Sequence, residues 1–154
     1  MTSKRSAALA LVRGDGADRE VLLVHYGGPF WAKKDAGAWT LTKGELEPGE
    51  DELYCAQREF MEETGSAPPA GPFIDLGEVR QKSGKIVHAF AARGDLDATA
   101  IHSNEVEVEY PAGSGKRIRF PEVDRAEWAR LERARIALNV AQLQLVERAL
   151  TAAV

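Results

Sequence analysis

The chain has 154 residues but only one cysteine, no long hydrophobic run and no excess of positive charge. A single cysteine excludes a disulfide bond within the chain, which fits a reducing compartment. The apolar run at residues 7–12 ends at Arg13 and is too short for a signal-peptide core, so we expect a cytoplasmic protein without a membrane partner. The formal net charge of −4 disfavours a general nucleic-acid-binding protein, because such proteins are usually basic.

Two common site patterns are also incomplete. Residues 113–116 read GSGK and resemble part of a phosphate-binding loop. However, Tyr110 stands where that motif needs its first glycine, and Arg117 stands where it needs Ser or Thr. The three histidines are far apart in sequence and form no zinc-binding pattern with the single cysteine. A hairpin turn is therefore the better interpretation of residues 113–116.

What the chain does contain is the composition of an ordinary globular domain. Hydrophobic residues make up 44% and charged residues 29% of the sequence, which argues against disorder. The length is sufficient to bury a hydrophobic core, and no internal repeat or low-complexity segment divides the chain. We therefore expect a single domain over residues 1–154.

Hydrophobic periodicity predicts a mixed order of strands and helices. Strands are expected at residues 6–13, 20–26, 39–43, 73–80, 85–92, 105–110 and 117–120, and helices at residues 51–64 and 134–152. Residues 123–128 fit either a last short strand or the start of a helix. The C-terminal helix is expected to be continuous, with an apolar side formed by Ile136, Val140, Leu143, Val146 and Leu150. This order predicts a fold of the α/β class.

The most informative stretch is an acidic segment at residues 44–65. Between Glu45 and Glu63 there are eight carboxylates and one cation, Arg58. Folding such a density of like charge is unfavourable unless a positive charge compensates it. Because Mg²⁺ takes oxygen ligands and keeps several waters, this segment predicts a site for a hard divalent cation.

The same segment resembles the signature of the Nudix hydrolases, which cleave a nucleoside diphosphate linked to a further group. All seven fixed letters of that signature are present at the required spacing: Gly44, Glu50, Arg58, Glu59, Glu62, Glu63 and Gly65. Two softer positions differ, because Phe60 is aromatic rather than aliphatic and Ser66 is polar. We call residues 44–66 the box. The resemblance implies an α/β/α sandwich, in which a mixed sheet lies between the box helix and a C-terminal helix.

A helix over residues 51–64 would place three box glutamates on one exposed face, since positions i, i+3 and i+4 are neighbours. These glutamates are Glu59, Glu62 and Glu63, and the apolar stripe opposite them contains Leu53, Ala56 and Phe60. The resemblance implies that Glu59 and Glu63 bind Mg²⁺, or Mn²⁺, directly, and that Glu62 binds directly or through water. It also implies a further ligand from the backbone carbonyl of Lys43 or Gly44. An isolated acidic helix face is often only solvated, but the complete spacing argues against that interpretation.

The remaining fixed letters have supporting roles by the same resemblance. Arg58 is expected to pair with Glu50 and so to orient the metal ligands. Gly44 and Gly65 are expected to permit backbone conformations that a side chain would hinder. The predicted catalytic set therefore consists of Glu50, Arg58, Glu59, Glu62 and Glu63.

The expected reaction is hydrolysis of a phosphoanhydride. Divalent ions neutralise phosphate oxygens and lower the pKa of bound water, so no nucleophilic side chain is required. The general base stays open between a box glutamate and an acid from a later segment. Glu105 and Glu107 are the later candidates, and Glu105 is also a candidate metal ligand. Alternatively, both belong only to the solvated face of a strand.

Candidate substrate contacts lie at the end of the predicted strand at residues 39–43 and in the loop before it. Lys43 directly precedes the box and could meet a substrate phosphate. In the loop at residues 27–37, Trp31 could stack on a base, and Lys33 and Lys34 could contact phosphates. Alternatively, Trp31 only anchors this loop to the core.

The sequence indicates the class of substrate less precisely than it indicates the type of reaction. Residues 39–44 read WTLTKG and resemble the W-x-L-P-K-G segment of diadenosine and diphosphoinositol polyphosphate hydrolases, with Thr42 in place of proline. The proline that follows the box in ADP-ribose pyrophosphatases is absent at Gln81. We expect a nucleotide with several phosphates, either a dinucleoside polyphosphate or a nucleoside triphosphate, and a protein that is a monomer or homodimer.

Three alternatives remain to be tested. Two are enzymes, which would hydrolyse ADP-ribose or a nucleoside diphosphate sugar. The third is a non-catalytic Nudix module that binds a nucleotide, which the intact box carboxylates disfavour.

Overall fold

In the part of the chain that the structure describes, the alternating apolar and turn segments fold into one large sheet, a separate hairpin and three α-helices. The computed structural model describes residues 4–154. The strands are β1 (Arg5–Arg13), β2 (Glu20–Tyr26), β3 (Trp39–Thr40), β4 (Thr42–Glu45), β5 (Ile74–Arg80), β6 (Ile86–Arg93), β7 (Glu105–Glu109), β8 (Arg117–Pro121) and β9 (Val123–Ala129). The α-helices are α1 (Glu52–Thr64), α2 (Leu131–Ala137) and α3 (Leu143–Thr151), and short 3₁₀ turns are η1 (Gly16–Asp18), η2 (Ala98–Ala100) and η3 (Val140–Gln142).

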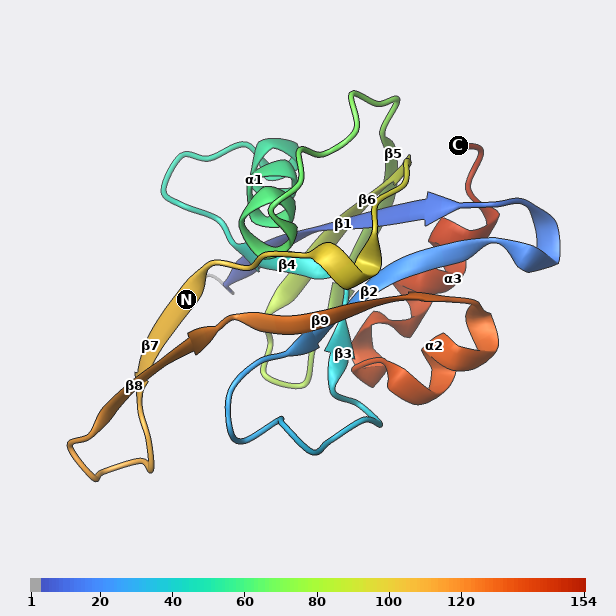
Figure 1. Cartoon of the computed structure of the whole chain (residues 1–154). Helices are drawn as coiled ribbons and strands as arrows, with labels where there is room; N and C mark the ends of the chain where they lie inside the picture. The colour runs from blue at the N-terminus through green and yellow to red at the C-terminus, as the bar shows by residue number, and fades with distance from the viewer. Residues whose placement is uncertain (1–3) are drawn as a thin grey trace.

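The large sheet is mixed. Five of its strands follow the order β3-β2-β1-β6-β5, β4 pairs with β1, and β9 pairs with β2. β1 and β6 run parallel, whereas the other pairs are antiparallel. β7 and β8 form a hairpin of their own, which extends away from the sheet (Figure 1). The sequence of residues 123–128 fitted either a strand or the start of a helix, and in the structure these residues form a strand, β9.

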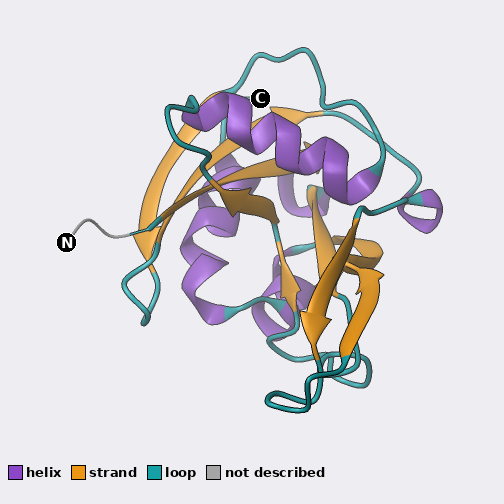
Figure 2. Ribbon diagram, turned by 90° about the vertical axis from the view of Figure 1, so that its left-hand side faces the viewer, coloured by secondary structure: helices purple, strands orange, loops and turns teal. Residues whose placement is uncertain are grey.

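Helices cover both faces of this sheet. Figures 1 and 2 show α1 on one side of the strands and α2 with α3 on the other. Each side has its own buried cluster, one beneath α1 and a larger one beneath α2 and α3. This arrangement confirms the predicted α/β/α sandwich with a mixed sheet between the box helix and the C-terminal helices.

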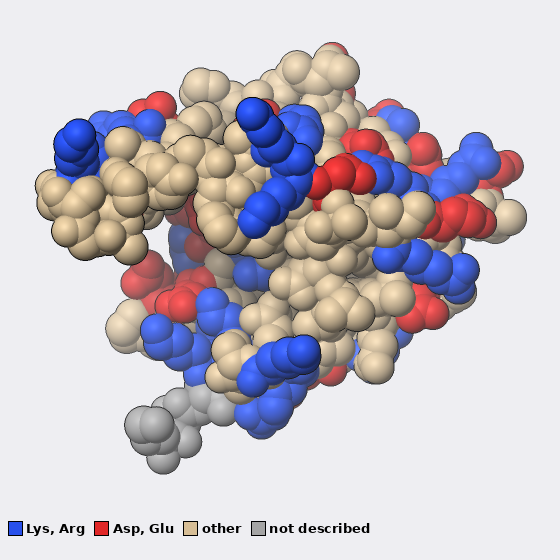
Figure 3. Space-filling view, turned by 90° about the horizontal axis from the view of Figure 1, so that it is seen from below, with Lys and Arg blue, Asp and Glu red and all other residues tan. Residues whose placement is uncertain are grey.

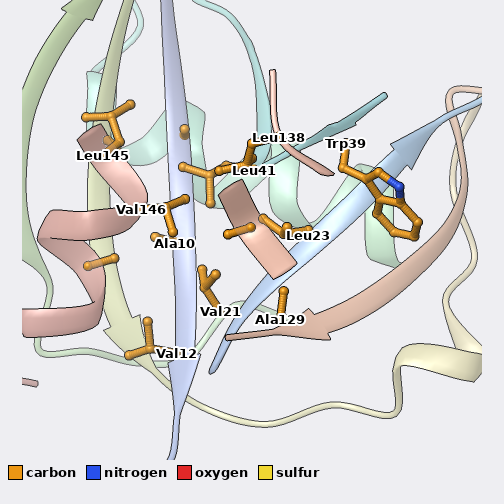
Figure 4. Packing of buried hydrophobic residues seen from close by; sticks show 14 of the residues in the cluster. Ala10, Val12, Val21, Leu23, Trp39, Leu41, Ala129, Leu138, Leu145 and Val146 are labelled. Atoms are coloured by element: carbon orange, nitrogen blue, oxygen red, sulfur yellow. The ribbon is translucent and has the colours of Figure 1, made fainter. Parts of the chain in front are cut away.

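The larger cluster joins the C-terminal helices to the two central strands. Leu145 and Val146 of α3 are fully buried, and Figure 4 shows them against the strand that carries Ala10. Val21 and Leu23 of β2 complete this side, and both are fully buried. Burying one such side chain contributes about 1.5–3 kcal/mol to the free energy of folding, so this cluster stabilises the packing of the helices on the sheet.

The box helix begins and ends where its sequence dictates. Asp51 caps the N-terminus, because its side chain accepts a hydrogen bond from the Tyr54 backbone N–H at 3.1 Å. Gly65 ends the helix in the left-handed conformation, with φ of 75°, and its N–H donates to the Met61 carbonyl. On the inner side, Phe60 is 1% exposed against the sheet. The predicted helix is confirmed to within one residue.

The prediction of one continuous helix over residues 134–152 is wrong. The helix stops after Ala137, because Leu138 turns inward and bridges Trp39 of β3. The Asn139 side chain then accepts a hydrogen bond from the Ala141 N–H at 3.1 Å, which starts a new turn. Gln142 enters the core, where its Oε1 accepts from the Leu41 N–H at 2.9 Å.

This break also changes which side chains are buried. Ile136 and Val140 were expected on the apolar side of the helix, but they are 59% and 80% exposed. Within residues 4–154, no helix has the length and apolar character needed to cross a membrane.

Candidate active site

The site begins where β4 passes under the box helix. Gly44 pairs with Ala7 on the face of the sheet that α1 covers. A Cβ atom built on Gly44 would lie 2.0 Å from the Glu59 Cδ atom. Because no side chain fits there, glycine is required at this position for Glu59 to approach the backbone of β4.

Replacing Gly44 with Ala is therefore expected to displace the Glu59 carboxylate and to lower kcat by at least about tenfold. Steady-state kinetics on the folded variant would measure this effect. Gly84→Ala is the matched control, because a Cβ at Gly84 meets no atom within 4 Å although its φ is +91°. That control should lose some stability and keep its kcat. Equal kcat values in the two variants would contradict the proposed packing.

Three carboxylates converge beside Gly44. The side chains of Glu59, Glu63 and Glu122 each offer an oxygen, and these oxygens all lie within 4.8 Å of one another. Glu59 and Glu63 come from α1, whereas Glu122 lies between β8 and β9. We call these three residues the carboxylate cluster.

A chain of backbone hydrogen bonds brings Glu122 to the box helix. The Asn104 N–H donates to the Glu62 carbonyl at 2.8 Å, and the Glu122 N–H donates to the Asn104 carbonyl at 2.9 Å. The segment before β7 thus joins the last turn of α1 to the beginning of β9. The position of Glu122 depends on these tertiary contacts, and no residue spacing in the sequence predicts it.

The predicted exposure of the box glutamates is wrong for two of them. Glu59 is 7% exposed and Glu63 is 2% exposed, because β4 and the segments around Asn104 and Glu122 pack against that side of α1. Glu62 keeps 40% of its side chain exposed. The acidic face of the helix is therefore an enclosed site and not a solvated surface.

Burial and like charge raise the pKa of two of these carboxyls. For Glu63, burial is the largest cause, and the charges of Glu122 and Glu59 raise its pKa further, well above the ordinary value. For Glu59, burial again raises the pKa. The Oε2 atom of Glu63 is buried and has no hydrogen-bond partner among residues 4–154. Clustered oxygens with an unpartnered buried atom are the donor set that a hard divalent cation binds.

Arg58 lies at the edge of the carboxylate cluster and holds it in place. Its Nε and Nη2 donate to the two oxygens of Glu50 at 2.7 and 2.9 Å, which confirms the predicted pairing. Its Nη1 also donates to Glu59 at 3.0 Å and to Glu62 at 3.1 Å. The bond from Arg58 lowers the pKa of Glu50 to about 2, so this pair stays ionised. A bidentate pair of this kind fixes the direction of the guanidinium, and thereby of Glu59.

Lys43 directly precedes Gly44 on β4 and interacts electrostatically with the cluster. Burial lowers the pKa of its ammonium, and the nearby charge of Lys85 lowers it further. The charges of Glu63, Glu122 and Glu59 act in the opposite direction, which places the ammonium within their electrostatic range. A cation at this position can contact an anion bound at the cluster.

An aromatic pocket of about 290 Å³ adjoins the cluster, and Glu122 lines both. The pocket is otherwise formed by the last residue of β2, the loop after it and the apolar face of the β7–β8 hairpin: Tyr26, Gly27, Gly28, Pro29, Phe30, Trp31, Val106, Val108, Tyr110 and Phe120. Figure 3 shows a hollow beside the hairpin, with acidic and basic side chains at its bottom.

Two glycines let the hairpin approach the loop. A Cβ on Gly27 would lie 1.9 Å from the Pro121 carbonyl oxygen, and one on Gly28 would lie 2.6 Å from the Phe120 ring. The Gly27 N–H also donates to the Glu122 carbonyl at 2.9 Å. This contact sets the position of Phe120 in the pocket and of Glu122 in the cluster.

The predicted substrate loop is only partly in this pocket. Trp31 lines the pocket and stacks on Tyr26, with ring centroids 4.8 Å apart. The Lys34 ammonium lies 3.4 Å from the Phe30 ring centroid, and Lys33 is exposed. Trp31 therefore lies where a base could bind, while Lys34 is occupied by an aromatic contact within the loop.

The acids expected from the β7 region occupy other positions. Glu105 is exposed at the start of β7 opposite Pro121. Glu107 pairs with Arg117 at 3.1 Å and with Arg119 at 3.7 Å on the charged face of the hairpin. The acid that joins Glu59 and Glu63 is instead Glu122, which the sequence did not single out because it stands alone between two strands.

A second group of potential ligands is already neutralised within the protein. Glu52, Glu78 and His88 also bring ligand atoms within 4.8 Å of one another. Arg5, however, donates to both glutamates, and His88 contacts Glu52 as well as Asp75. These contacts tie the first turn of α1 to the sheet, so we interpret the group as structural.

Comparison with known proteins agrees with this geometry. The family model described as "NUDIX domain" matches residues 3–149, and the chain belongs to this family. The match confirms the predicted class, a hydrolase that acts on phosphoanhydride bonds. A search of curated proteins found no match.

Several solved structures have the same fold at low sequence identity. The NUDIX domain of Shewanella oneidensis NrtR, complexed with ADP ribose, is 20% identical with a TM-score of 0.66, covering 97% of this chain and 87% of that one. A C. elegans Ap4A hydrolase binary complex is 21% identical with a TM-score of 0.62, covering 94% and 93%. The E. coli ORF135 protein is 22% identical with a TM-score of 0.61, covering 96% and 89%.

Proposed function

We propose that this chain is a pyrophosphohydrolase that uses Mg²⁺, or Mn²⁺, to cleave a phosphoanhydride bond of a nucleotide. The observation that carries this proposal is the carboxylate cluster, in which Glu59 and Glu63 are buried, the Oε2 of Glu63 has no hydrogen-bond partner among residues 4–154, and Glu122 also lines an aromatic pocket. In this proposal Glu59, Glu63 and Glu122 hold the metal. Glu62 and the backbone of Gly44 are further candidate ligands, and Glu105 is the alternative to Glu122.

The pocket and the cluster fit the two ends of a nucleotide. Aromatic walls bind a base by stacking, which contributes about 1–3 kcal/mol per base and tolerates different bases. Because Glu122 lines the pocket and the cluster, a base stacked on Trp31 or Phe120 would direct its phosphates toward the cluster. Lys43, which interacts electrostatically with the cluster, would then neutralise a phosphate oxygen.

The chemistry follows from this placement. A bound divalent ion neutralises phosphate oxygens and lowers the pKa of a bound water. Arg58 and Glu50 keep Glu59 oriented toward the site. A neighbouring carboxylate that does not hold the metal, for which Glu62 is the candidate in the box, would accept the proton of the attacking water, and the phosphoanhydride oxygen would leave with the second product.

The positive charge near the cluster favours a substrate with several phosphates. The Lys43 ammonium interacts electrostatically with all three cluster carboxylates, and Lys85, which pairs with Glu45 at 3.1 Å, acts electrostatically on Lys43. We therefore propose a dinucleoside polyphosphate or a nucleoside triphosphate. The similarity to an Ap4A hydrolase supports the first of these, and the similarity to an ADP-ribose complex supports ADP-ribose as the alternative.

A substrate panel tests this proposal. Purified protein with Mg²⁺ would be incubated with diadenosine polyphosphates, nucleoside triphosphates, ADP-ribose and sugar nucleotides, and the products identified by mass. ATP plus AMP from diadenosine tetraphosphate, or monophosphate plus pyrophosphate from a triphosphate, is the expected result. Binding of these nucleotides without any turnover would instead support a non-catalytic module.

Replacing Lys43 with Ala is expected to raise KM by about tenfold and to change kcat less, since a charged contact to a phosphate contributes mainly to binding. Steady-state kinetics on the best substrate of the panel would measure both constants. Lys33→Ala, in the exposed part of the loop, is the control and should leave KM nearly unchanged. A lower thermal stability of Lys43→Ala with an unchanged KM would make Lys43 a structural residue.

Mg²⁺ is expected to stabilise the protein more strongly as the pH rises. The pKa of Glu63 is higher in the folded state than in the unfolded state, so the stability linked to its proton is lost as pH rises through the folded value. Mg²⁺ compensates the ionised carboxylates and should raise Tm by about 5 °C at a hundredfold excess over its Kd. Thermal unfolding with and without Mg²⁺ across pH would measure this; a shift independent of pH would contradict it.

A further inference from the structure

A histidine is buried in the centre of the sheet near the pocket. His25 of β2 has no exposed surface, and the four residues before it are buried and aliphatic. Its Nε2 lies 2.6 Å from the Lys34 carbonyl oxygen, and its Nδ1 lies 2.9 Å from the Asp124 carboxylate. A carbonyl oxygen can only accept, so Nε2 carries a hydrogen and donates it to Lys34.

An irregularity in the sheet directs Asp124 toward this histidine. His25 pairs with Arg125, but the next residue, Tyr26, pairs with Val123, so the register shifts and Asp124 has no partner across the ladder. Such bulges change the direction of a side chain and are common beside active sites. The bulge also lies two residues after Glu122, the cluster residue that lines the pocket.

From His25 the contacts continue to the wall of the pocket. The Lys34 N–H donates to the Trp31 carbonyl at 2.9 Å, and the Trp31 N–H donates to the Gly28 carbonyl at 3.2 Å. Gly28 and Trp31 both line the pocket. The hydrogen bond from His25 therefore fixes one end of a chain of turns whose other end is the wall on which a base would stack.

A second contact holds the same segment from α2. Arg133 donates to the two oxygens of Asp35 at 2.8 and 2.7 Å, and the Trp39 indole donates to Asp35 at 3.0 Å. Trp39 in turn lies edge-on to the His25 ring, with centroids 5.1 Å apart. The loop is thus fastened at Lys34 and Asp35, close to its C-terminal end, whereas Phe30 near its middle is 58% exposed.

We propose that His25 is a positioning residue for substrate binding, which holds the loop at residues 27–37 so that Trp31 forms the wall of the nucleotide pocket, with Arg133 as a second anchor. This inference rests on the proposed function. A polar side chain in an apolar core gains little net stability over an aliphatic one, because its desolvation offsets its hydrogen bonds. Instead, the hydrogen bonds of a buried polar side chain determine the conformation of the segment that they contact, which for His25 is the loop at residues 27–37.

Two substitutions separate the two hydrogen bonds of His25. In His25→Gln the side-chain amide reaches the position of Nε2 and can still donate to the Lys34 carbonyl. In His25→Asn the shorter amide reaches only the position of Nδ1 and keeps the contact with Asp124. The two variants have similar chemistry, so a general loss of core packing should affect both.

The expected result is a difference in KM. His25→Asn should raise KM by about tenfold with kcat within about twofold of wild type, whereas His25→Gln should restore KM to within about threefold. Amide hydrogen exchange at Trp31 and Lys34 should be faster in His25→Asn than in His25→Gln. Equal KM values and equal exchange in the two variants would overturn the proposal, as would a loss confined to kcat.

The test remains decisive if another part of the account fails. If wild-type protein hydrolyses nothing in the panel, the proposed function fails, and exchange at Trp31 and Lys34 still decides whether His25 positions the loop. If both His25 variants fail to fold, Arg133→Met tests the second anchor of the same loop, the contact between Arg133 and Asp35, which is more exposed than His25. It should raise KM by about threefold without changing kcat, and an unchanged KM would overturn the role of this anchor.

Discussion

Replacing Glu63 with Gln is expected to lower kcat at least about a hundredfold while the protein stays folded. Glu63 is 2% exposed, and its Oε2 has no partner within residues 4–154, so this oxygen is available to a metal. The amide has nearly the same shape but lacks the charge and presents an NH₂ group in place of one oxygen. Steady-state kinetics with saturating Mg²⁺ would measure the loss.

The same substitution should affect stability in the opposite direction. Without metal, Glu63 is buried beside Glu59 and Glu122, and its raised pKa shows that its charge is unfavourable there. Glu63→Gln should therefore have a metal-free Tm equal to or above that of the wild type. Glu107→Gln, on the charged face of the hairpin, is the control and should keep its kcat. Activity near wild type in Glu63→Gln would contradict the metal assignment.

Glu122→Gln is expected to have the second-largest effect, a decrease in kcat of about ten- to a hundredfold. Glu122 supplies the third oxygen of the carboxylate cluster from outside the box and also lines the pocket. Because it acts at the metal, the loss should lessen when the Mg²⁺ concentration is raised. Titrating kcat against free Mg²⁺ would separate weaker metal binding from a direct role in proton transfer.

Glu105→Gln is the matched comparison for Glu122→Gln. The sequence left Glu105 as a candidate ligand outside the box, whereas the structure has it exposed at the start of β7. If Glu122 is the ligand, Glu105→Gln should keep kcat within about twofold of wild type. The reverse pattern, with loss in Glu105→Gln alone, would return the role to Glu105 and require the hairpin to move on binding.

The box could be predicted from sequence because its information is local. The spacing of Arg58, Glu59 and Glu63 on one helix, with Asp51 before it and Gly65 after it, depends on residues within a few turns. Two neighbouring contacts were implied by the family resemblance of the same stretch, namely the Arg58–Glu50 pair and the close approach of backbone at Gly44.

What could not be predicted depends on contacts between distant segments. Glu122 reaches the cluster through hydrogen bonds that link Glu62, Asn104 and Glu122, and no periodicity encodes that link. The same packing buries Glu59, which helix geometry alone had placed on an exposed face. The break at Leu138 was missed because the apolar period continues through it, while the bridge to Trp39 that causes it is tertiary.

The measurement that tests the account most directly is the rate of phosphoanhydride hydrolysis as a function of free Mg²⁺. It would be made on wild type, Glu63→Gln and Glu107→Gln with the best substrate of the panel. The account predicts no turnover without a divalent ion, saturable activation in wild type and Glu107→Gln, and at least about a hundredfold less activity in Glu63→Gln. Turnover that persists with a chelator present, or that is equal in all three proteins, would contradict it.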